Sequence, residues 1–184
     1  MAIPVPAELV DAARTGGRDE IDLLLRTVWP DAYRLARGIV GEDQPAEDAA
    51  QEACIIVYRT IASLRSSAAF RTWFYRIVVR EAAELKRRRS RAEPAPDAPV
   101  SAADQTAPID VWRALSGLTN KLREVVVLRY FEDLSSPEIA TVLGIPEGTV
   151  RFRLMIAKQR LRPLLGDYGE RYSQPTGEAR TNAI

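Results

Sequence analysis

Residues 92–108 cannot contribute to a hydrophobic core, and this stretch divides the chain into two parts. Proline, alanine and acidic residues follow one another there with no hydrophobic periodicity. Such a segment buries too little apolar surface to offset its chain entropy, and its prolines favour an extended path. We therefore expect one folded domain within residues 1–91, a flexible acidic linker at 92–108, a second domain at 109–165 and a disordered tail at 166–184.

Charge is distributed unevenly between these parts, although the whole chain is nearly neutral, with 26 basic and 25 acidic residues. Residues 29–92 carry 12 basic and 8 acidic side chains, a net charge of +4, and residues 111–165 carry 9 and 5, again +4. Residues 93–110 carry 4 acidic side chains and no basic one. Two basic domains on either side of an acidic connector indicate a polyanionic partner that is contacted at two places.

The residue types that are missing exclude several classes of protein. The sequence has no histidine and one cysteine, Cys54, which excludes an intrachain disulfide, a zinc site of His or Cys ligands and a Ser-His-Asp triad. It also lacks a glycine-rich phosphate loop, so we expect no cofactor, no metal and no enzymatic activity. The apolar runs are too short to span a bilayer, and no basic stretch leads into an apolar one at the start. A reduced, cytoplasmic protein is therefore expected.

Hydrophobic spacing predicts an all-α fold of two small helical domains. Between residues 46 and 64 apolar side chains recur every three or four positions, as on a helix with one buried stripe. Another helix is expected to begin at Phe70, and Pro30 is expected to separate two helices. The expected helices cover residues 7–15, 19–28, 31–40, 46–64, 70–91, 110–116, 120–132, 135–143 and 147–165.

The stretch around Gly144 carries the local signals of a helix-turn-helix. Ser135 and Glu138 form an S-x-x-E capping box, and Pro137 falls in the first turn, where its missing N–H would be unpaired anyway. Gly144 permits the positive φ that ends this helix, and a second helix starts near Pro146. The alternative is a helical hairpin whose basic face only contacts water. That alternative does not explain why a capping box, a glycine turn and a basic face occur together, as they do in a helix-turn-helix. The outward face of the second helix carries Thr149, Arg151, Phe152, Arg153, Met155, Lys158 and Gln159.

Arginine on such a face can read guanine in the major groove, while lysine and threonine can hold phosphates. Phe152 does not fit this pattern. An exposed aromatic ring there would contact a thymine methyl group, whereas a buried one would pack against Tyr130 or Phe131. The sequence leaves both possibilities open.

A polar arc with an apolar residue at its centre is expected on the helix that follows residue 45. On a helical wheel of 100° per residue, the polar side chains fall within an arc of about 140°, with Ile55 in the middle. This pattern favours a protein-docking surface, although single exposed apolar residues are common. The polar members of the arc are Glu47, Asp48, Gln51 and Glu52.

The helix that begins at Phe70 ends in the basic run of residues 86–91, with aromatic residues at 73–75 one or more turns earlier. Cations beside aromatic rings suit single-stranded nucleic acid, whose phosphates meet arginine and whose unstacked bases meet rings. The alternative assigns the aromatic residues to the core and treats the basic run as a solvated helix end favoured by the helix dipole.

The order of these motifs resembles that of the extracytoplasmic-function sigma factors, the minimal two-domain members of the bacterial sigma-70 family. Residues 45–52, Pro-Ala-Glu-Asp-Ala-Ala-Gln-Glu, are similar to the D-A-E-D-x-x-Q-E segment of region 2.2. Residues 70–77, Phe-Arg-Thr-Trp-Phe-Tyr-Arg-Ile, resemble the F-x-x-W-L-y-x-I run of region 2.3. Residues 138–140, Glu-Ile-Ala, and 148–151, Gly-Thr-Val-Arg, resemble the E-I-A and G-T-V-K of region 4.2. The resemblance covers about residues 7–165.

The resemblance implies a transcription initiation factor that directs core RNA polymerase to promoters. It would bind the clamp helices of the largest subunit and the flap of the second-largest subunit, and an anti-sigma factor would hold it silent. Polymerase docking would involve Glu47, Asp48, Gln51, Glu52 and Ile55. The unpaired −10 strand would contact Arg65, Ser66, Phe70, Arg71, Trp73, Arg76, Arg80, Lys86, Arg87 and Arg88. The −35 duplex would contact Ser135, Glu147, Thr149, Arg151, Phe152, Arg153 and Lys158.

Four positions depart from the family pattern. Arg80 stands where asparagine is common and would favour a phosphate contact over a base contact. Phe152 replaces a small polar residue and Ile156 replaces a cation, so the −35 sequence of other members cannot be transferred. Cys54 takes the place of an aromatic residue, and we expect it to be buried and inert.

Two other functions compete with this interpretation. A free-standing helix-turn-helix regulator with a helical dimerisation domain is disfavoured, because its two reading heads need a rigid spacing that residues 92–108 do not provide. A helical adaptor that binds only proteins leaves the basic run and the helix-turn-helix face without a purpose. By contrast, 17 extended linker residues span about 60 Å, or about 17 base pairs, so one chain could read two elements at once.

Overall fold

The computed structural model describes residues 5–92 and 111–165, and within these ranges every regular element is helical. The expected all-α fold of two helical domains is therefore confirmed. The expected linker, apart from Ala92, and the expected tail lie outside the described residues. The helices are α1 (Ala7–Arg14), α2 (Arg18–Val40), α3 (Asp43–Thr60), α4 (Phe70–Ala92), α5 (Val111–Ser116), α6 (Asn120–Tyr130), α7 (Ser136–Leu143) and α8 (Glu147–Leu165), with the 3-10 turns η1 (Ile61–Ser63) and η2 (Ser67–Ala69) between α3 and α4.

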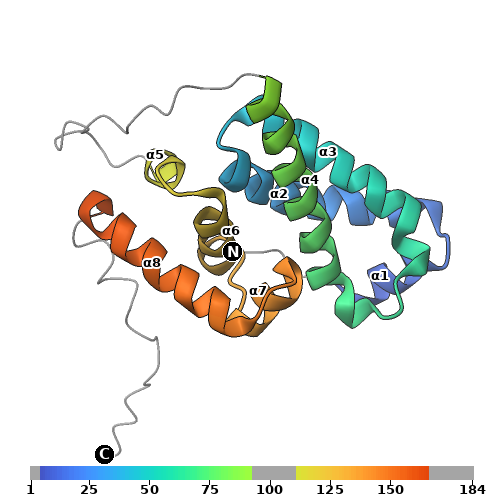
Figure 1. The fold of residues 1–184 in the computed structure, drawn as a ribbon. Coiled ribbons are helices and arrows are strands. Elements are labelled where there is room, and N and C mark those ends of the chain that lie inside the picture. The colour runs from blue at the N-terminus through green and yellow to red at the C-terminus, as the bar shows by residue number, and fades with distance from the viewer. Residues whose placement is uncertain (1–4, 93–110, 166–184) are drawn as a thin grey trace, which may run out of the picture.

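The N-terminal domain is a bundle of α2, α3 and α4, with α1 packed against α2 and beside η1 and η2 (Figure 1). The apolar stripe expected on α3 is buried, and four of its members are alanines, which let the neighbouring helices approach closely. α3 begins at Asp43 rather than at residue 46, because Pro45 falls in its first turn, where no N–H is required.

Pro30 does not break the chain into two helices, so that expectation is wrong: α2 runs without interruption from Arg18 to Val40. Proline inside a helix removes one hydrogen bond and costs about 3 kcal/mol. Here Leu24 and Val28 before the proline and Leu35 after it are all fully buried in the same core. Because a helix on both sides of Pro30 is needed to bury these side chains, packing outweighs the local penalty.

The C-terminal domain contains the expected helix-turn-helix. The Ser135 hydroxyl accepts a hydrogen bond from the backbone N–H of Glu138, whose carboxylate accepts from the N–H of Ser135, so both halves of the capping box are present. Gly144 ends α7 with φ +64°. Val150, Ala157 and Leu161 then face inward from α8. The local sequence signals therefore predicted this motif correctly.

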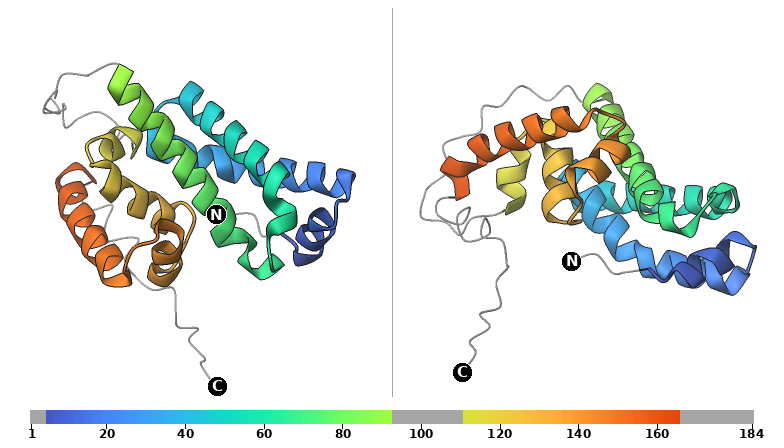
Figure 2. Two further views of the ribbon diagram at one scale, coloured as in Figure 1. Left: turned by 45° about the vertical axis from the view of Figure 1, so that its right-hand side comes forward. Right: turned by 90° about the horizontal axis from the view of Figure 1, so that it is seen from below.

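The two domains are packed against each other. α6 lies against α2, and α7 lies against α4. Figures 1 and 2 show α6, α7 and α8 on one side of α4 and α3 on the other. The buried side chains of both domains form one hydrophobic cluster. Among the described residues, no helix has the length and apolar character needed to cross a membrane.

The conformation at Gly144 leads to a stability prediction. Gly144→Ala places a side chain at φ +64° and should lower the free energy of unfolding by about 1 kcal/mol. Gly148 is helical, and no atom lies within 4 Å of the position its Cβ would take. Gly148→Ala, the matched control, should therefore raise that free energy by about 0.5 kcal/mol. Urea denaturation followed by circular dichroism measures both, and an equal sign for the two variants would contradict the prediction.

Candidate nucleic-acid interface

The polar arc on α3 is fully presented to solvent. Glu47, Asp48, Gln51 and Glu52 are exposed, and Ile55 in their midst is half-buried. The helix that carries this acidic face, α3, lies on the opposite side of α4 from α6, α7 and α8 (Figures 1 and 2). A partner could therefore bind it without displacing the C-terminal domain.

Tyr58 belongs to the same face of α3, although the sequence pattern did not lead us to predict it as a docking residue. Its side chain is 53% exposed. On the helical wheel it lies about 20° from Glu47, so extending the wheel by one turn would have found it. An exposed aromatic ring beside an acidic arc strengthens the interpretation of this face as a docking surface.

The aromatic residues at the start of α4 belong mainly to the core. Phe70 is only 3% exposed, and its ring stacks on that of Phe74 with centroids 5.7 Å apart. Trp73 is half-buried, 6.0 Å from Phe70. In this arrangement Phe70 does not present its ring to a base. Ser66 is exposed and caps η2 by accepting a hydrogen bond from the N–H of Ala68.

Two of the expected strand-binding arginines on α4 contact the C-terminal domain. Arg71 donates to the backbone oxygen of Glu132, and its guanidinium lies 5.7 Å from the ring centroid of Tyr75. Arg76 donates to the backbone oxygen of Thr141 over 2.7 Å. Arg65 and Arg80 are exposed. All four arginines are therefore exposed, and two of them, Arg71 and Arg76, also donate hydrogen bonds to the loop before α7 and to α7.

The cations at the basic end of α4 have acidic and backbone carbonyl partners. Arg87 and Arg88 both bind Glu84, at 2.6 and 3.0 Å. Arg89 binds Glu42 at 2.9 Å. Lys86 turns inward and donates to the backbone oxygen of Ile39 over 3.1 Å. The first two arginines remain exposed and can exchange these partners for phosphates.

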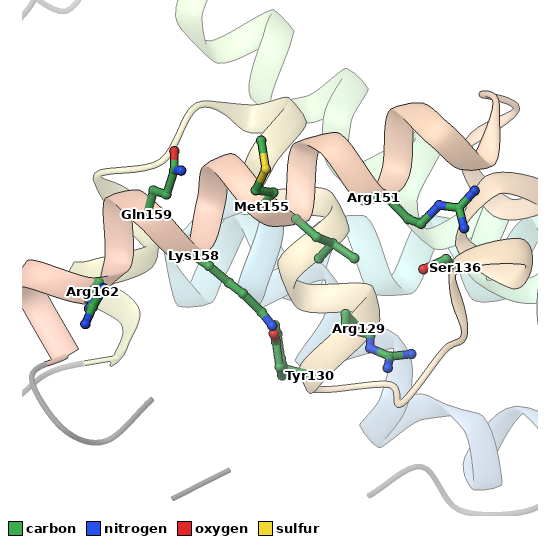
Figure 3. Close-up of a pocket in the computed structure, with 9 residues that line it drawn as sticks. Arg129, Tyr130, Ser136, Arg151, Met155, Lys158, Gln159 and Arg162 are labelled. Atoms are coloured by element: carbon green, nitrogen blue, oxygen red, sulfur yellow. The ribbon is translucent and has the colours of Figure 1, made fainter. Parts of the chain in front are cut away.

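The solvent face of α8 borders an open groove of about 500 Å³. Figure 3 shows Arg151 beside Ser136 at one end of the groove and Lys158 extending towards Tyr130. Leu154 and Met155 are the apolar residues of its lining. Cationic and apolar side chains together suit the phosphates and base edges of a major groove. The lining residues are Arg129, Tyr130, Ser136, Arg151, Leu154, Met155, Lys158, Gln159 and Arg162.

The remaining predicted −35 residues are placed as follows. Phe152 is 60% exposed, which excludes the alternative that it is buried against Tyr130 or Phe131. Thr149 and Arg153 are half-buried, and Glu147 lies 3.5 Å from Arg151.

The sequence analysis missed two cations of the groove, Arg129 on α6 and Arg162 on α8. Arg162 could have been found, since residues 151, 155, 158 and 162 share one face of a helix. Arg129 lies on another helix, and only the tertiary fold brings it to the groove.

Among the described residues, no cluster of His, Cys, Asp or Glu could hold a metal ion. Cys54 is half-buried rather than buried, because its position on α3 lies at the edge of the apolar stripe. Partial burial raises the pKa of its thiol to about 11, which leaves little reactive thiolate at neutral pH.

Comparison with known proteins identifies both domains. Residues 24–92 match the family model Sigma-70 region 2, and residues 109–161 match Sigma-70, region 4. The ECF RNA polymerase sigma factor SigM of Mycobacterium tuberculosis is 36% identical over 168 residues, which cover 87% of this chain and 84% of the relative. This chain belongs to the sigma-70 family. The RNA polymerase sigma-H factor of Pseudomonas aeruginosa is 32% identical over 184 residues, covering 86% of this chain and 94% of that protein.

Solved structures show the same sigma-factor fold. CnrH, in complex with the cytosolic domain of CnrY, has a TM-score of 0.68 and 24% identity, covering 88% of this chain and 97% of CnrH. RpoE of Bartonella quintana, in complex with the anti-sigma factor NepR, has a TM-score of 0.67 and 22% identity, covering 80% of this chain and 97% of RpoE. Region 2 thus contains the acidic face of α3 and the basic helix α4, and region 4 contains the helix-turn-helix.

The environment of Lys86 in region 2 leads to a pH prediction. Burial lowers the pKa of its amine from 10.5 to about 8. Between these values the unfolded chain binds the proton that the folded chain has released, so folding becomes more favourable as the pH rises. Below a pH of about 8 both states are charged and the slope disappears. Because the amine is only half-buried, we expect about 0.5 kcal/mol per pH unit rather than the ~1.4 kcal/mol of a whole proton.

Lys86→Met should remove this contribution, as measured by urea denaturation at several pH values in that window. Lys121, an exposed lysine on α6, supplies the matched control. Lys121→Met should retain the slope of the wild-type protein. A wild-type slope no steeper than that of Lys86→Met would refute the assignment.

Proposed function

We propose that this chain is a promoter-specificity subunit of bacterial RNA polymerase of the extracytoplasmic-function type, acting in the cytoplasm. It is an initiation factor rather than an enzyme. The observation that carries the proposal is the joint presence of two surfaces on one chain: an exposed acidic face on region 2 and an exposed cationic groove on the helix-turn-helix of region 4. One surface suits a protein partner and the other suits DNA.

Polymerase docking is assigned to α3. Asp48 and Gln51 stand exposed beside the half-buried Ile55, and Tyr58 adds apolar area at the end of the face. An apolar centre surrounded by polar groups is the usual anatomy of a specific protein interface. The clamp helices of the largest polymerase subunit are the proposed partner, with the flap of the second-largest subunit as the partner of region 4. An anti-sigma factor is a further proposed partner.

Reading of the −35 duplex is assigned to α8, and capture of the −10 strand to the loop before α4 and to α4 itself. Arg151 and Phe152 are the exposed side chains nearest the start of α8, where a recognition helix contacts base edges. Lys158 lines the groove further along and suits a phosphate. On α4, Arg80 and the arginines at 87 and 88 are exposed and suit the phosphates of a single strand.

Transcription with purified core polymerase tests the proposal directly. The wild-type protein should direct run-off synthesis from a defined set of start sites on fragmented bacterial genomic DNA. The double variant Asp48→Ala and Gln51→Ala should weaken core binding by about tenfold or more without unfolding the domain, since both side chains are exposed. Fluorescence anisotropy of labelled protein titrated with core polymerase measures that binding.

Asp19→Ala is the matched control, because it also removes one exposed carboxylate, from α2 instead of α3. It should bind core polymerase like the wild-type protein. Unchanged affinity of the α3 double variant would remove the docking assignment, and the absence of defined start sites for the wild-type protein would remove the function.

Arg151 yields a separate prediction for sequence readout. If its guanidinium binds guanine with two hydrogen bonds, Arg151→Ala should reduce discrimination between duplex sequences by about 1–3 kcal/mol. Arg151→Lys should keep most of the affinity but lose the discrimination, because an ammonium group cannot make the paired contact. Arg160→Ala removes an exposed cation from the opposite side of α8 and serves as the control. Selection of bound sequences from a random duplex library measures all three, and a uniform loss for Arg151→Ala would mark a phosphate contact.

A further inference from the structure

Two exposed apolar side chains lie on one face of α8. Phe152 is 60% exposed, more than any other large apolar side chain in the described part of the chain, and Met155 is 47% exposed. Residues three positions apart in a helix are neighbours on its surface. No aromatic or cation–π pair among the described residues includes the ring of Phe152. The fold therefore leaves this apolar pair available to a partner.

Gly148 keeps the start of this face open. On a helical wheel it lies about 40° from Phe152 and about 20° from Met155. No atom lies within 4 Å of the position that its Cβ would take. A glycine in the first turn of α8 allows another molecule to approach the helix backbone closely. A partner can therefore reach the ring of Phe152 across position 148 without meeting a side chain there.

Exposed cations border the apolar pair on the side of Met155. Arg151, Lys158 and Arg162 fall within about 40° of one another on the wheel, and all three line the groove of α8. The side chain of Arg151 is 67% exposed, although it lies 3.5 Å from a carboxylate oxygen of Glu147. A row of cations selects a polyanion. The partner that fits this face therefore carries negative charges and apolar groups side by side.

A DNA duplex meets both requirements when its major groove contains methyl groups. Thymine carries a methyl group on C5 of its ring, whereas cytosine has a hydrogen there unless it has been methylated to 5-methylcytosine. Contact with one such methyl group removes apolar area from water and should raise affinity by about fourfold. Along the axis of α8, residues three positions apart are separated by about 4.5 Å, close to the roughly 3.4 Å between base pairs. The apolar pair can thus reach one base pair or two neighbouring ones.

We propose that Phe152 and Met155 form a contact site for the C5-methyl group of a pyrimidine in the −35 duplex. The site accepts thymine and 5-methylcytosine alike, because both bases present the same methyl group at the same place. It disfavours cytosine and uracil, which have a hydrogen there. This inference rests on the proposed function for the identity of the duplex, and it adds a methyl-dependent component to the hydrogen-bonded readout assigned to Arg151.

Replacement of thymine by uracil tests the site directly, because it removes the methyl group and keeps every hydrogen-bonding group of the base. Core polymerase carrying the wild-type protein selects duplexes from a random library made with thymidine and from the same library made with deoxyuridine. Sequencing of the bound duplexes gives the base preference at each position. We expect an upstream position at which the enrichment of thymine is about fourfold greater than the enrichment of uracil.

Phe152→Ala separates the methyl contact from other effects of uracil. If the ring contacts the methyl group, removing both should cost little more than removing the ring alone. With this variant, the thymine and uracil forms of one selected, fluorescein-labelled duplex should differ in affinity by less than about 1.5-fold. Met155→Ala should reduce the difference to about twofold. Fluorescence anisotropy with the polymerase-bound protein measures both variants.

Val111→Ala is the matched control, because it removes another apolar side chain of region 4, on α5, that is 47% exposed. It should retain the whole difference between the thymine and uracil duplexes. A full difference retained by Phe152→Ala would overturn the inference, and one retained by Met155→Ala would remove Met155 from the site.

Cytosine methylation distinguishes the two sources of the methyl group. At the position that the uracil library identifies, cytosine is compared with 5-methylcytosine in an otherwise identical duplex. Methylation should raise the affinity of the wild-type protein by about fourfold, and that of Phe152→Ala by less than about 1.5-fold. No effect of methylation on the wild-type protein would overturn the proposed equivalence of the two bases.

Salt dependence distinguishes an apolar contact from a phosphate contact. An apolar contact releases no counterions, so Phe152→Ala should lower the affinity without changing the slope of its logarithm against the logarithm of the salt concentration. Lys158→Ala should reduce that slope by about 1, as expected for one lost phosphate contact. A reduced slope for Phe152→Ala would contradict a direct methyl contact.

Failure of this inference and failure of the proposed function give different results. If the same upstream sequence is selected from both libraries, the proposed function stands and the methyl site is overturned. If the protein does not bind core polymerase, or no upstream sequence is selected, the proposed function is overturned and the inference with it. Phe152→Ala should bind core polymerase like the wild-type protein. A loss of that binding, with no difference between thymine and uracil, would assign this face to a protein partner instead.

Discussion

The buried carboxylate of Glu132 constrains how the helices of the two domains are placed relative to one another. A charged group without access to water is destabilised by several kcal/mol unless its oxygens are paired. Arg34 from α2 and Tyr75 from α4 supply those hydrogen bonds. Because α2 and α4 are also the central helices of the N-terminal bundle, a shift of about 1 Å in either would break a charged hydrogen bond. The loop before α7 is therefore held in register with the core of region 2.

This packing leaves two candidate surfaces free of contacts between the domains and involves part of a third in such contacts. The acidic face of α3 and the cationic groove of α8 are open to solvent. Arg71 and Arg76 on α4 instead donate to backbone oxygens of region 4. The proposed docking face is therefore free of region 4, whereas two of the arginines proposed for strand capture already have partners there.

Local signals in the sequence predicted local structure well. The capping box of Ser135 and Glu138 and the left-handed Gly144 need only their neighbours in sequence, and both are present as expected. The helix break expected at Pro30 was wrong. The free-energy cost of a proline inside a helix is local, whereas the packing that outweighs this cost depends on the whole bundle. The contact between Arg34 and Glu132 joins residues 98 positions apart, and nothing around a glutamate in a loop marks it as buried. The sequence therefore predicted which helix faces carry the candidate interface. It did not predict which helices contact one another across the two domains.

The polar contact of Glu132 lies within a contact that is also apolar. The buried side chains of both domains form one hydrophobic cluster, so the packing of region 4 on region 2 is stabilised by apolar area removed from water, at about 25 cal/mol for each Å². A buried ion pair adds little net stability but excludes other geometries, because a shift would leave a charge unpaired. The glycine at position 38 acts in the same direction, because α2 approaches α6 too closely there for a side chain. Apolar burial therefore stabilises the contact, whereas Arg34, Tyr75 and Glu132 fix its geometry.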